Sequence, residues 1–317
     1  MPKKQPQLDG SLERHLTILT KQISGGKVIP FLGAGVNLAG RPPGTSFECT
    51  KTLPSGTELA SYLAKTFGYP SIEAENLTRV SQYVAVMTGS GPLYDELRSV
   101  FKIECNPSPL HHLLAALSTR LRGNDRAPDH QLIVTTNYDD LLERAFEAED
   151  QPFDLLIYIA DGENAGRFLH RPPDGSILLI EKPNEYRGLD FKRRPAILKI
   201  HGTLDRTDSE RDSFVITEDH YINYLAHVGT SSMLPPNVIN KLRRSNFLFL
   251  GYSLRDWNLR VFLHRIWGEQ KLTYNSWAIQ RNPNEIEKKF WEKRNVEIYN
   301  IDLERYVAEL ARRVGNQ

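Results

Sequence analysis

Short apolar runs that end directly in Gly, Asn, His or another polar residue recur along the chain, and they constrain its fold more than any other feature. Uninterrupted apolar runs of this length are typical of strands that are buried on both faces of a parallel sheet. Segments with helical spacing, such as 11–24, lie between them. The sequence therefore predicts an α/β fold with a mostly parallel sheet flanked by helices. The runs lie at 27–32, 131–135, 155–159, 177–180, 197–200, 247–250 and 276–279.

The segment 38–129 has a different pattern from the rest of the chain. Loops rich in Pro and Gly come first, and three stretches with helical spacing follow, at 57–67, 77–87 and 110–122. We expect a helical insertion between the first two core strands. The 317 residues suffice for one elaborated domain over 1–317, which from residue 282 ends in a helix, a strand and a closing helix.

Charge and composition exclude several classes of protein. The 40 Lys and Arg against 39 Asp and Glu give a net charge of +1, so we expect no direct binding of nucleic acid and no attraction to an anionic membrane. The first residues lack an apolar stretch, and the apolar runs are too short to span a bilayer, which predicts a cytoplasmic protein. Cys49 and Cys105 alone cannot form a four-thiolate zinc site, so no metal is expected.

The first strand, 27–32, ends in Gly33-Ala34-Gly35. Such a turn lets the backbone approach a pyrophosphate closely, with free N–H groups donating at the head of the next helix. The third glycine of the dinucleotide fingerprint is missing, so a tight turn without a ligand stays an equal alternative. Pro30 is unusual inside a strand, because proline cannot donate a hydrogen bond.

Polar residues also follow the strand at 131–135. Asn137 stands at the strand end, where its amide can donate to and accept from a ribose or a water molecule. Asp139 or Asp140 could instead cap the helical segment that begins at 141. Because ligands of open α/β sheets bind outside the carboxyl ends of the strands, these residues should share a crevice with the other strand ends.

Two later strands end in the same manner. His201 follows 197–200, at a place where a general base would be wanted, although a single His before Gly is more often structural. Gly251 and Ser253 follow 247–250 and offer a close backbone approach and a hydroxyl contact, or form a plain turn.

Taken in order, Gly-Ala-Gly at 33–35, Thr-Thr-Asn-Tyr-Asp at 135–139, Lys-Ile-His-Gly at 199–202 and Gly-Tyr-Ser-Leu at 251–254 resemble the landmark motifs of the sirtuin superfamily, most closely its bacterial Sir2-like branch. The resemblance implies a Rossmann-like domain that binds NAD as a substrate. It also implies hydrolysis of the nicotinamide–ribose bond, which gives nicotinamide and ADP-ribose and in several members depletes NAD in abortive infection, an antiviral defence.

Carried over by position, the resemblance implies catalytic roles for Asn137 and His201. It places Gly33, Ala34 and Gly35 at the pyrophosphate, Asp139 with Asn137 at the nicotinamide-ribose pocket, and Gly251 and Ser253 at the ribose and phosphates of the adenosine half. Thr136 is also expected to bind NAD. Asn37 stands in a loop that differs from the one in deacetylases, so its binding role is a hypothesis. No cysteine follows Cys105, so the four-cysteine zinc module of the deacetylases is absent, and we expect no conventional deacetylase.

Two other functions stay open: a regulatory module that binds NAD or ADP-ribose without turnover, and an NAD-dependent deacylase or ADP-ribosyltransferase. The family also implies control, because unrestrained loss of NAD kills the cell. We therefore expect a homo-oligomer, or a separately encoded partner such as a HerA-like ATPase or an Argonaute-like protein.

Overall fold

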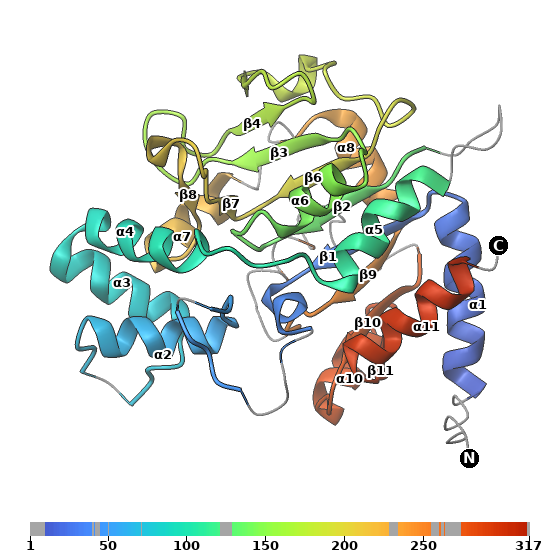
Figure 1. Ribbon diagram of the computed structural model, residues 1–317, viewed down its shortest axis with the longest axis horizontal. Coiled ribbons are helices and arrows are strands. Elements are labelled where there is room, and N and C mark those ends of the chain that lie inside the picture. The colour runs from blue at the N-terminus through green and yellow to red at the C-terminus, as the bar shows by residue number, and fades with distance from the viewer. Residues whose placement is uncertain are drawn as a thin grey trace.

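The fold is built on one large sheet (Figure 1). The computed structural model describes residues 10–39, 41, 45–49, 51–70, 72–120, 129–227, 234–254, 260, 263 and 274–315. Nine of its strands form this sheet in the order β11-β10-β9-β1-β2-β6-β3-β4-β5. They are β1 (Val28–Leu32), β2 (Leu132–Thr135), β3 (Asp154–Tyr158), β4 (Phe168–Arg171), β5 (Leu178–Ile180), β6 (Ala196–Lys199), β9 (Asn246–Leu250), β10 (Ser276–Gln280) and β11 (Val296–Asn300).

The sheet is parallel from β11 to β3, and only β4 and β5 add antiparallel pairs at one edge. This confirms the predicted Rossmann-like α/β class. The central strands are buried along their whole length and mostly apolar, as expected where helices cover both faces. Pro30 does lie inside β1, where it pairs with Leu248 of β9, and pairing with β2 begins at Phe31.

Helices cover both faces of the sheet, each over its own apolar core. One core joins the sheet to α1 (Gly10–Ser24), α5 (Pro109–Arg120), α6 (Leu141–Ala148) and α11 (Leu303–Gly315). The other joins it to α7 (Glu218–His227), α8 (Pro236–Arg243) and α10 (Glu285–Glu292). Side chains of one strand alternate between these cores, so that Ile197 faces the first core and Leu198 the second.

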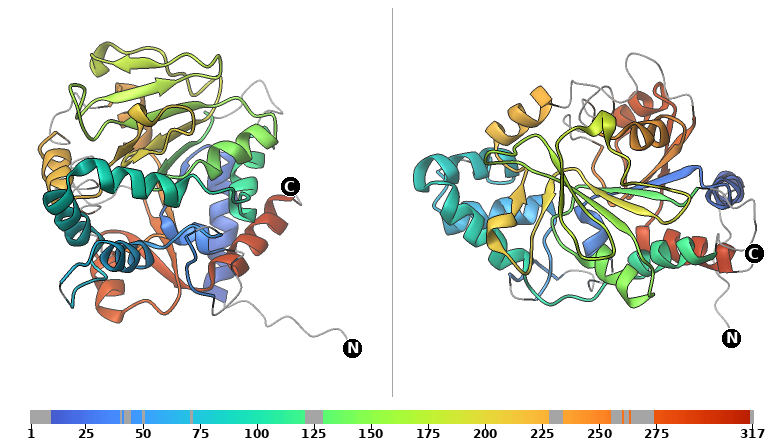
Figure 2. Two further views of the ribbon diagram at one scale, coloured as in Figure 1. Left: turned by 60° about the vertical axis from the view of Figure 1, so that its left-hand side comes forward. Right: turned by 90° about the horizontal axis from the view of Figure 1, so that it is seen from above.

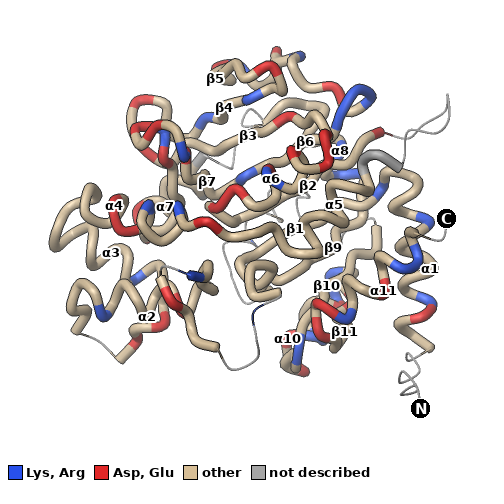
Figure 3. Tube along the Cα trace, viewed as in Figure 1, with Lys and Arg blue, Asp and Glu red and all other residues tan. Residues whose placement is uncertain are grey.

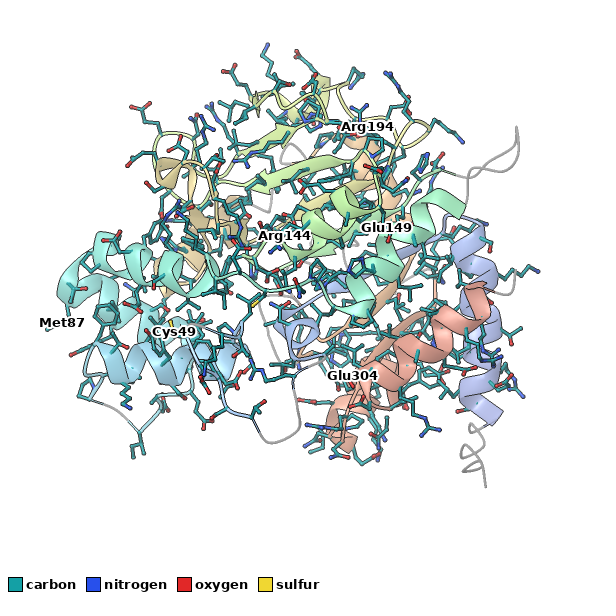
Figure 4. All side chains as sticks on the ribbon, viewed as in Figure 1. Cys49, Met87, Arg144, Glu149, Arg194 and Glu304 are labelled. Carbon is teal, nitrogen blue, oxygen red and sulfur yellow. The ribbon has the colours of Figure 1, made fainter. Side chains whose placement is uncertain are left out.

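The chain between β1 and β2 forms several helices. α2 (Gly56–Thr66), α3 (Leu77–Thr88) and α4 (Ser90–Phe101) pack around a third core, while α5 returns to the sheet. Figures 1 and 2 show α2 to α4 on the side of the molecule opposite α1, and Met87 marks their outer limit in Figure 4. The sequence prediction missed α4, because Pro92 reads as a loop signal although proline is well tolerated in a first turn. Residues 121–128 lie outside the described part.

Short elements complete the carboxyl ends of the strands. These are the 3-10 helices η1 (Ala34–Leu38), η2 (Pro183–Glu185) and η3 (Ser209–Arg211) and a ribbon of β7 (Gly202–Thr203) and β8 (Ser213–Phe214). Basic and acidic positions are interspersed along the trace in Figure 3, in keeping with the small net charge. Within the described ranges, none of the helices combines the length and the apolarity needed to cross a membrane.

Candidate functional site

Four strand ends converge on one cavity. The strands β9, β1, β2 and β6 are neighbours in the sheet and parallel, so the loops that follow them emerge at one edge. These loops line a cavity of about 380 Å³, called the central cavity below. Nine of the ten residues predicted from the sequence line it: Ala34, Gly35, Asn37, Thr136, Asn137, Asp139, His201, Gly251 and Ser253. The tenth, Gly33, is tied to this wall, because its carbonyl accepts from the Asn137 amide at 3.3 Å.

The glycines after β1 let its loop touch the loop after β9. The N–H of Gly33 donates to the Leu250 carbonyl at 3.1 Å, and the N–H of Gly35 donates to the Gly251 carbonyl at 2.8 Å. A Cβ atom on Gly35 would lie 2.6 Å from the Gly251 oxygen, so only glycine fits. Gly251 itself has a φ of +61°.

This packing differs from the expectation of free N–H donors before a helix. The N–H of Val36 is also engaged, with the Gly33 carbonyl at 3.0 Å, and the following element η1 is a 3-10 helix of five residues. The glycines are therefore explained first by contact between the two loops, which sets the floor of the central cavity.

Asn137 presents an amide oxygen to the site. Its N–H donates to Thr135 Oγ1 at 3.0 Å and its Nδ2 to the Gly33 carbonyl, which fixes the side chain. Among the described residues, no hydrogen-bond donor reaches its Oδ1, although the residue is only 8% exposed. Buried polar atoms nearly always have a partner, so an acceptor left over beside a cavity suits a bound molecule.

Asp139 links the loop after β2 to the loop after β1. Its Oδ1 accepts from the N–H of Leu141, the first residue of α6, at 3.2 Å, which agrees with the expected role at a helix start. Its Oδ2 accepts from Asn37 Nδ2 at 2.7 Å, and in the described chain Asn37 Oδ1 has no partner. Asp140 instead pairs with Arg206 at 2.5 Å.

His201 lies at the end of β6, buried and in contact with aromatic rings. The rings of Tyr221 and Tyr224 on α7 stand edge-on to it, with centroids at 5.5 and 5.7 Å. Gly202 has a φ of +85°, and a Cβ there would lie 2.1 Å from the Ser213 carbonyl oxygen. Glycine is therefore required for the turn that holds His201 in the cavity wall.

The insertion forms the opposite wall of the central cavity. Ser55, Gly56 and Thr57 line it, together with Phe101 from α4. Ser55 is the N-cap of α2 in a capping box with Glu58, so this loop is a structural turn before a helix. The same turn nevertheless faces the cavity.

A family model described as a SIR2-like domain matches residues 131–299, more than half of the chain. The chain belongs to the SIR2-like domain family. It is 23% identical over 321 residues to defense-associated sirtuin 2 from Bacillus subtilis, with 95% of this chain and 27% of that protein covered. It is 27% identical over 195 residues to NAD(+) hydrolase ThsA from Acinetobacter baumannii, with 61% of this chain and 32% of that protein covered. The chain thus spans at most about a third of these relatives.

This SIR2-like domain also holds site features that the sequence prediction missed. Tyr221 lines the central cavity from α7, at a position where nothing in the spacing marks it. A second cavity of about 670 Å³, called the outer cavity below, shares Gly35, Gly251, Tyr252 and Ser253 with the first. It continues past the ends of β10 and β11, between 279–283 and 301–304. The ends of β10 and β11, at Gln280 and Asn300, could have indicated the outer cavity in the sequence, because the ends of parallel strands lie at one edge of the sheet.

Proposed function

We propose that this SIR2-like domain hydrolyses NAD at the bond between nicotinamide and ribose. The observation that carries the proposal is the meeting, in one cavity, of His201 with the Asn137 amide oxygen that lacks a partner among the described residues. The relative named NAD(+) hydrolase ThsA supports the same reaction.

The two cavities suggest how the dinucleotide lies. The nicotinamide ribose occupies the central cavity, and the adenosine half lies in the outer cavity. The pyrophosphate crosses where the cavities meet, at Gly35, Gly251 and Ser253. The absence of side chains on both glycines permits the close approach, and the Ser253 hydroxyl supplies a donor.

The reaction needs a water molecule and a place for its proton. Nicotinamide leaves with the electron pair of the broken bond, so the ribose carbon becomes electron-poor and the oxygen of water bonds to it. The Asn137 amide oxygen accepts a hydrogen bond from this water, and His201 takes a proton from the water or from a ribose hydroxyl. The products are nicotinamide, ADP-ribose and one proton. Asp139, held by Asn37, lies beside the ribose.

The test measures, by chromatography, the nicotinamide that the purified protein releases from NAD. General acid–base catalysis contributes about 10² to 10⁴ in rate, so His201→Ala and Asn137→Ala should each lose turnover of that order. His112→Ala on α5 is the matched control, because its half-exposed ring lies at the surface beside Glu149 and does not line the central cavity, so the change should not alter turnover. Wild-type turnover in His201→Ala would exclude the assignment.

Other outcomes would select the other functions. Binding of NAD without any turnover, in infected-cell extracts as well, would indicate a regulatory module. Loss of an acyl group from a peptide, dependent on NAD, would indicate a deacylase.

We infer a role in antiphage defence from the relative named defense-associated sirtuin 2. Such a hydrolase must be held inactive until infection, through assembly of several copies or through a separate ATPase or Argonaute-like partner. Sizing the protein in extracts before and after infection tests this, and a monomer in both would contradict it.

A further inference from the structure

A lysine is buried in the apolar layer behind the loop 136–140, which follows β2. Lys199 is the last residue of β6 and is 0% exposed. By strand alternation its side chain lies on the same face as Ile197, where the neighbours belong to the apolar core under α5 and α6. Burial of an ammonium group costs several kcal/mol unless it is paired and hydrogen-bonded. The position therefore requires an explanation.

Lys199 spans from α6 to the loop 136–140. Its Nζ donates to Glu143 Oε1 on α6 at 2.7 Å, and also to the backbone carbonyl of Asp139. Burial raises the pKa of the Glu143 carboxyl, and the charge of Lys199 opposes that rise. His111 on α5 lies close by, and burial lowers its pKa to about 4, so that it stays neutral beside the pair.

Stability alone does not explain this pair. A buried ion pair can often be replaced by apolar side chains of similar size without loss of stability. What an apolar pair cannot supply is a donor for the Asp139 carbonyl. The preceding carbonyl, of Tyr138, accepts from the Leu204 N–H at 2.9 Å and from Thr203 Oγ1 at 3.2 Å, so the end of β7 and the residue after it hold that part of the loop. For Asp139 the donor comes from the Lys199 side chain.

We propose that Lys199 is a positioning residue that fixes the loop 136–140, so that Asn137 and Asp139 face His201 across the central cavity. The proposal rests on the proposed NAD hydrolysis for its kinetic readout. Lys199 touches no substrate, and it acts through the Asp139 carbonyl.

The decisive variant is Lys199→Met with Glu143→Leu, which replaces the pair by apolar side chains and leaves no buried charge unpaired. A misplacement of about 1 Å in a catalytic group can cost about 10²-fold in rate. We expect kcat for NAD to fall by about that factor, with a much smaller change in KM. Hydrogen exchange should become faster at the amides of 137–141, while the midpoint of denaturant unfolding stays near that of the wild type.

Arg194→Met is the matched control. It also breaks an ion pair with a buried carboxylate, because Arg194 donates twice to Asp154 at 2.9 Å. Asp154 lies at the amino end of β3, away from the strand ends that line the central cavity. Figure 4 shows Arg194 well apart from Arg144, which marks α6, the helix of Glu143. This variant should unfold more easily and keep its kcat.

The outcomes separate the two proposals. Wild-type kcat and wild-type exchange in the double variant would overturn the role of Lys199, as would an equal loss of kcat in Arg194→Met. If the wild type releases no nicotinamide, the proposed function fails, and exchange alone decides the role of Lys199. Faster exchange confined to 137–141 then supports it, and unchanged exchange overturns it.

Discussion

The two ends of the central sheet both bury polar groups, but they do so in different ways. At the amino end, Asp154 begins β3 with its two oxygens fully engaged: His170 Nε2 lies 2.7 Å away, and Arg194 donates to both oxygens. At the carboxyl end, the amide oxygens of Asn37 and Asn137 have no partner among the described residues. They face a cavity of about 380 Å³.

This difference separates a structural cluster from a binding site. A buried ion cluster with every oxygen engaged holds strands together and has no capacity for another molecule. Buried acceptors beside a cavity cost free energy unless something fills it. The comparison predicts that changes at the amino end alter stability, and that changes at the carboxyl end alter turnover.

The largest effect on stability is expected from Asp154→Asn. The change keeps the side-chain volume but leaves Arg194 without its countercharge and His170 without its carboxylate partner. Removal of one partner from a buried pair costs about 3–5 kcal/mol. Denaturant unfolding should show a loss of that size, while nicotinamide release per folded molecule stays unchanged. A large fall in kcat with normal stability would reverse the comparison.

The second effect is on the pH dependence of stability, and it arises where His15 on α1 contacts Tyr306 on α11. Burial lowers the pKa of His15 to about 4, below its ordinary 6.5, and its Nε2 lies 2.8 Å from the Tyr306 hydroxyl. His15 is therefore neutral in the fold, and below pH 6.5 the unfolded chain binds more protons than the folded one. The contribution of neutral His15 to the free energy of unfolding should be fully present above pH 6.5. It should fall by about 3 kcal/mol as the pH approaches 4.

Unfolding curves between pH 7.5 and pH 4, roughly the window in which the linkage acts, would measure this fall. His111 has the same direction of shift, with a pKa of about 4. His15→Gln should therefore remove only the part due to His15. An unchanged slope in His15→Gln would show that His15 does not titrate on unfolding.

The sequence predicted the part of the molecule that depends on local pattern. The seven apolar runs predicted as strands are all present, and the loops that follow four of them lie together because parallel strands end at one edge. The sequence did not predict β4, where His170 and Arg171 interrupt the apolar pattern. Nor did it predict Lys199 as a buried residue or Tyr221 as a cavity residue, since both depend on contacts between elements far apart in the chain.

The smallest effect is expected where the insertion meets the central cavity. Ser55 Oγ accepts from the Glu58 N–H at 3.2 Å, and Glu58 Oε2 accepts from the Ser55 N–H at 2.8 Å. Ser55→Ala should cost about 1 kcal/mol of stability through loss of this cap. Because Ser55 also lines the cavity, KM for NAD should rise with it. Asn284→Ala removes the cap of α10, where the side chain accepts from the Ile286 N–H at 2.8 Å, and Asn284 lines neither the central nor the outer cavity. It should cost about as much stability and leave KM unchanged. Equal KM values in the two variants would show that the turn before α2 supports the cavity wall without contacting NAD.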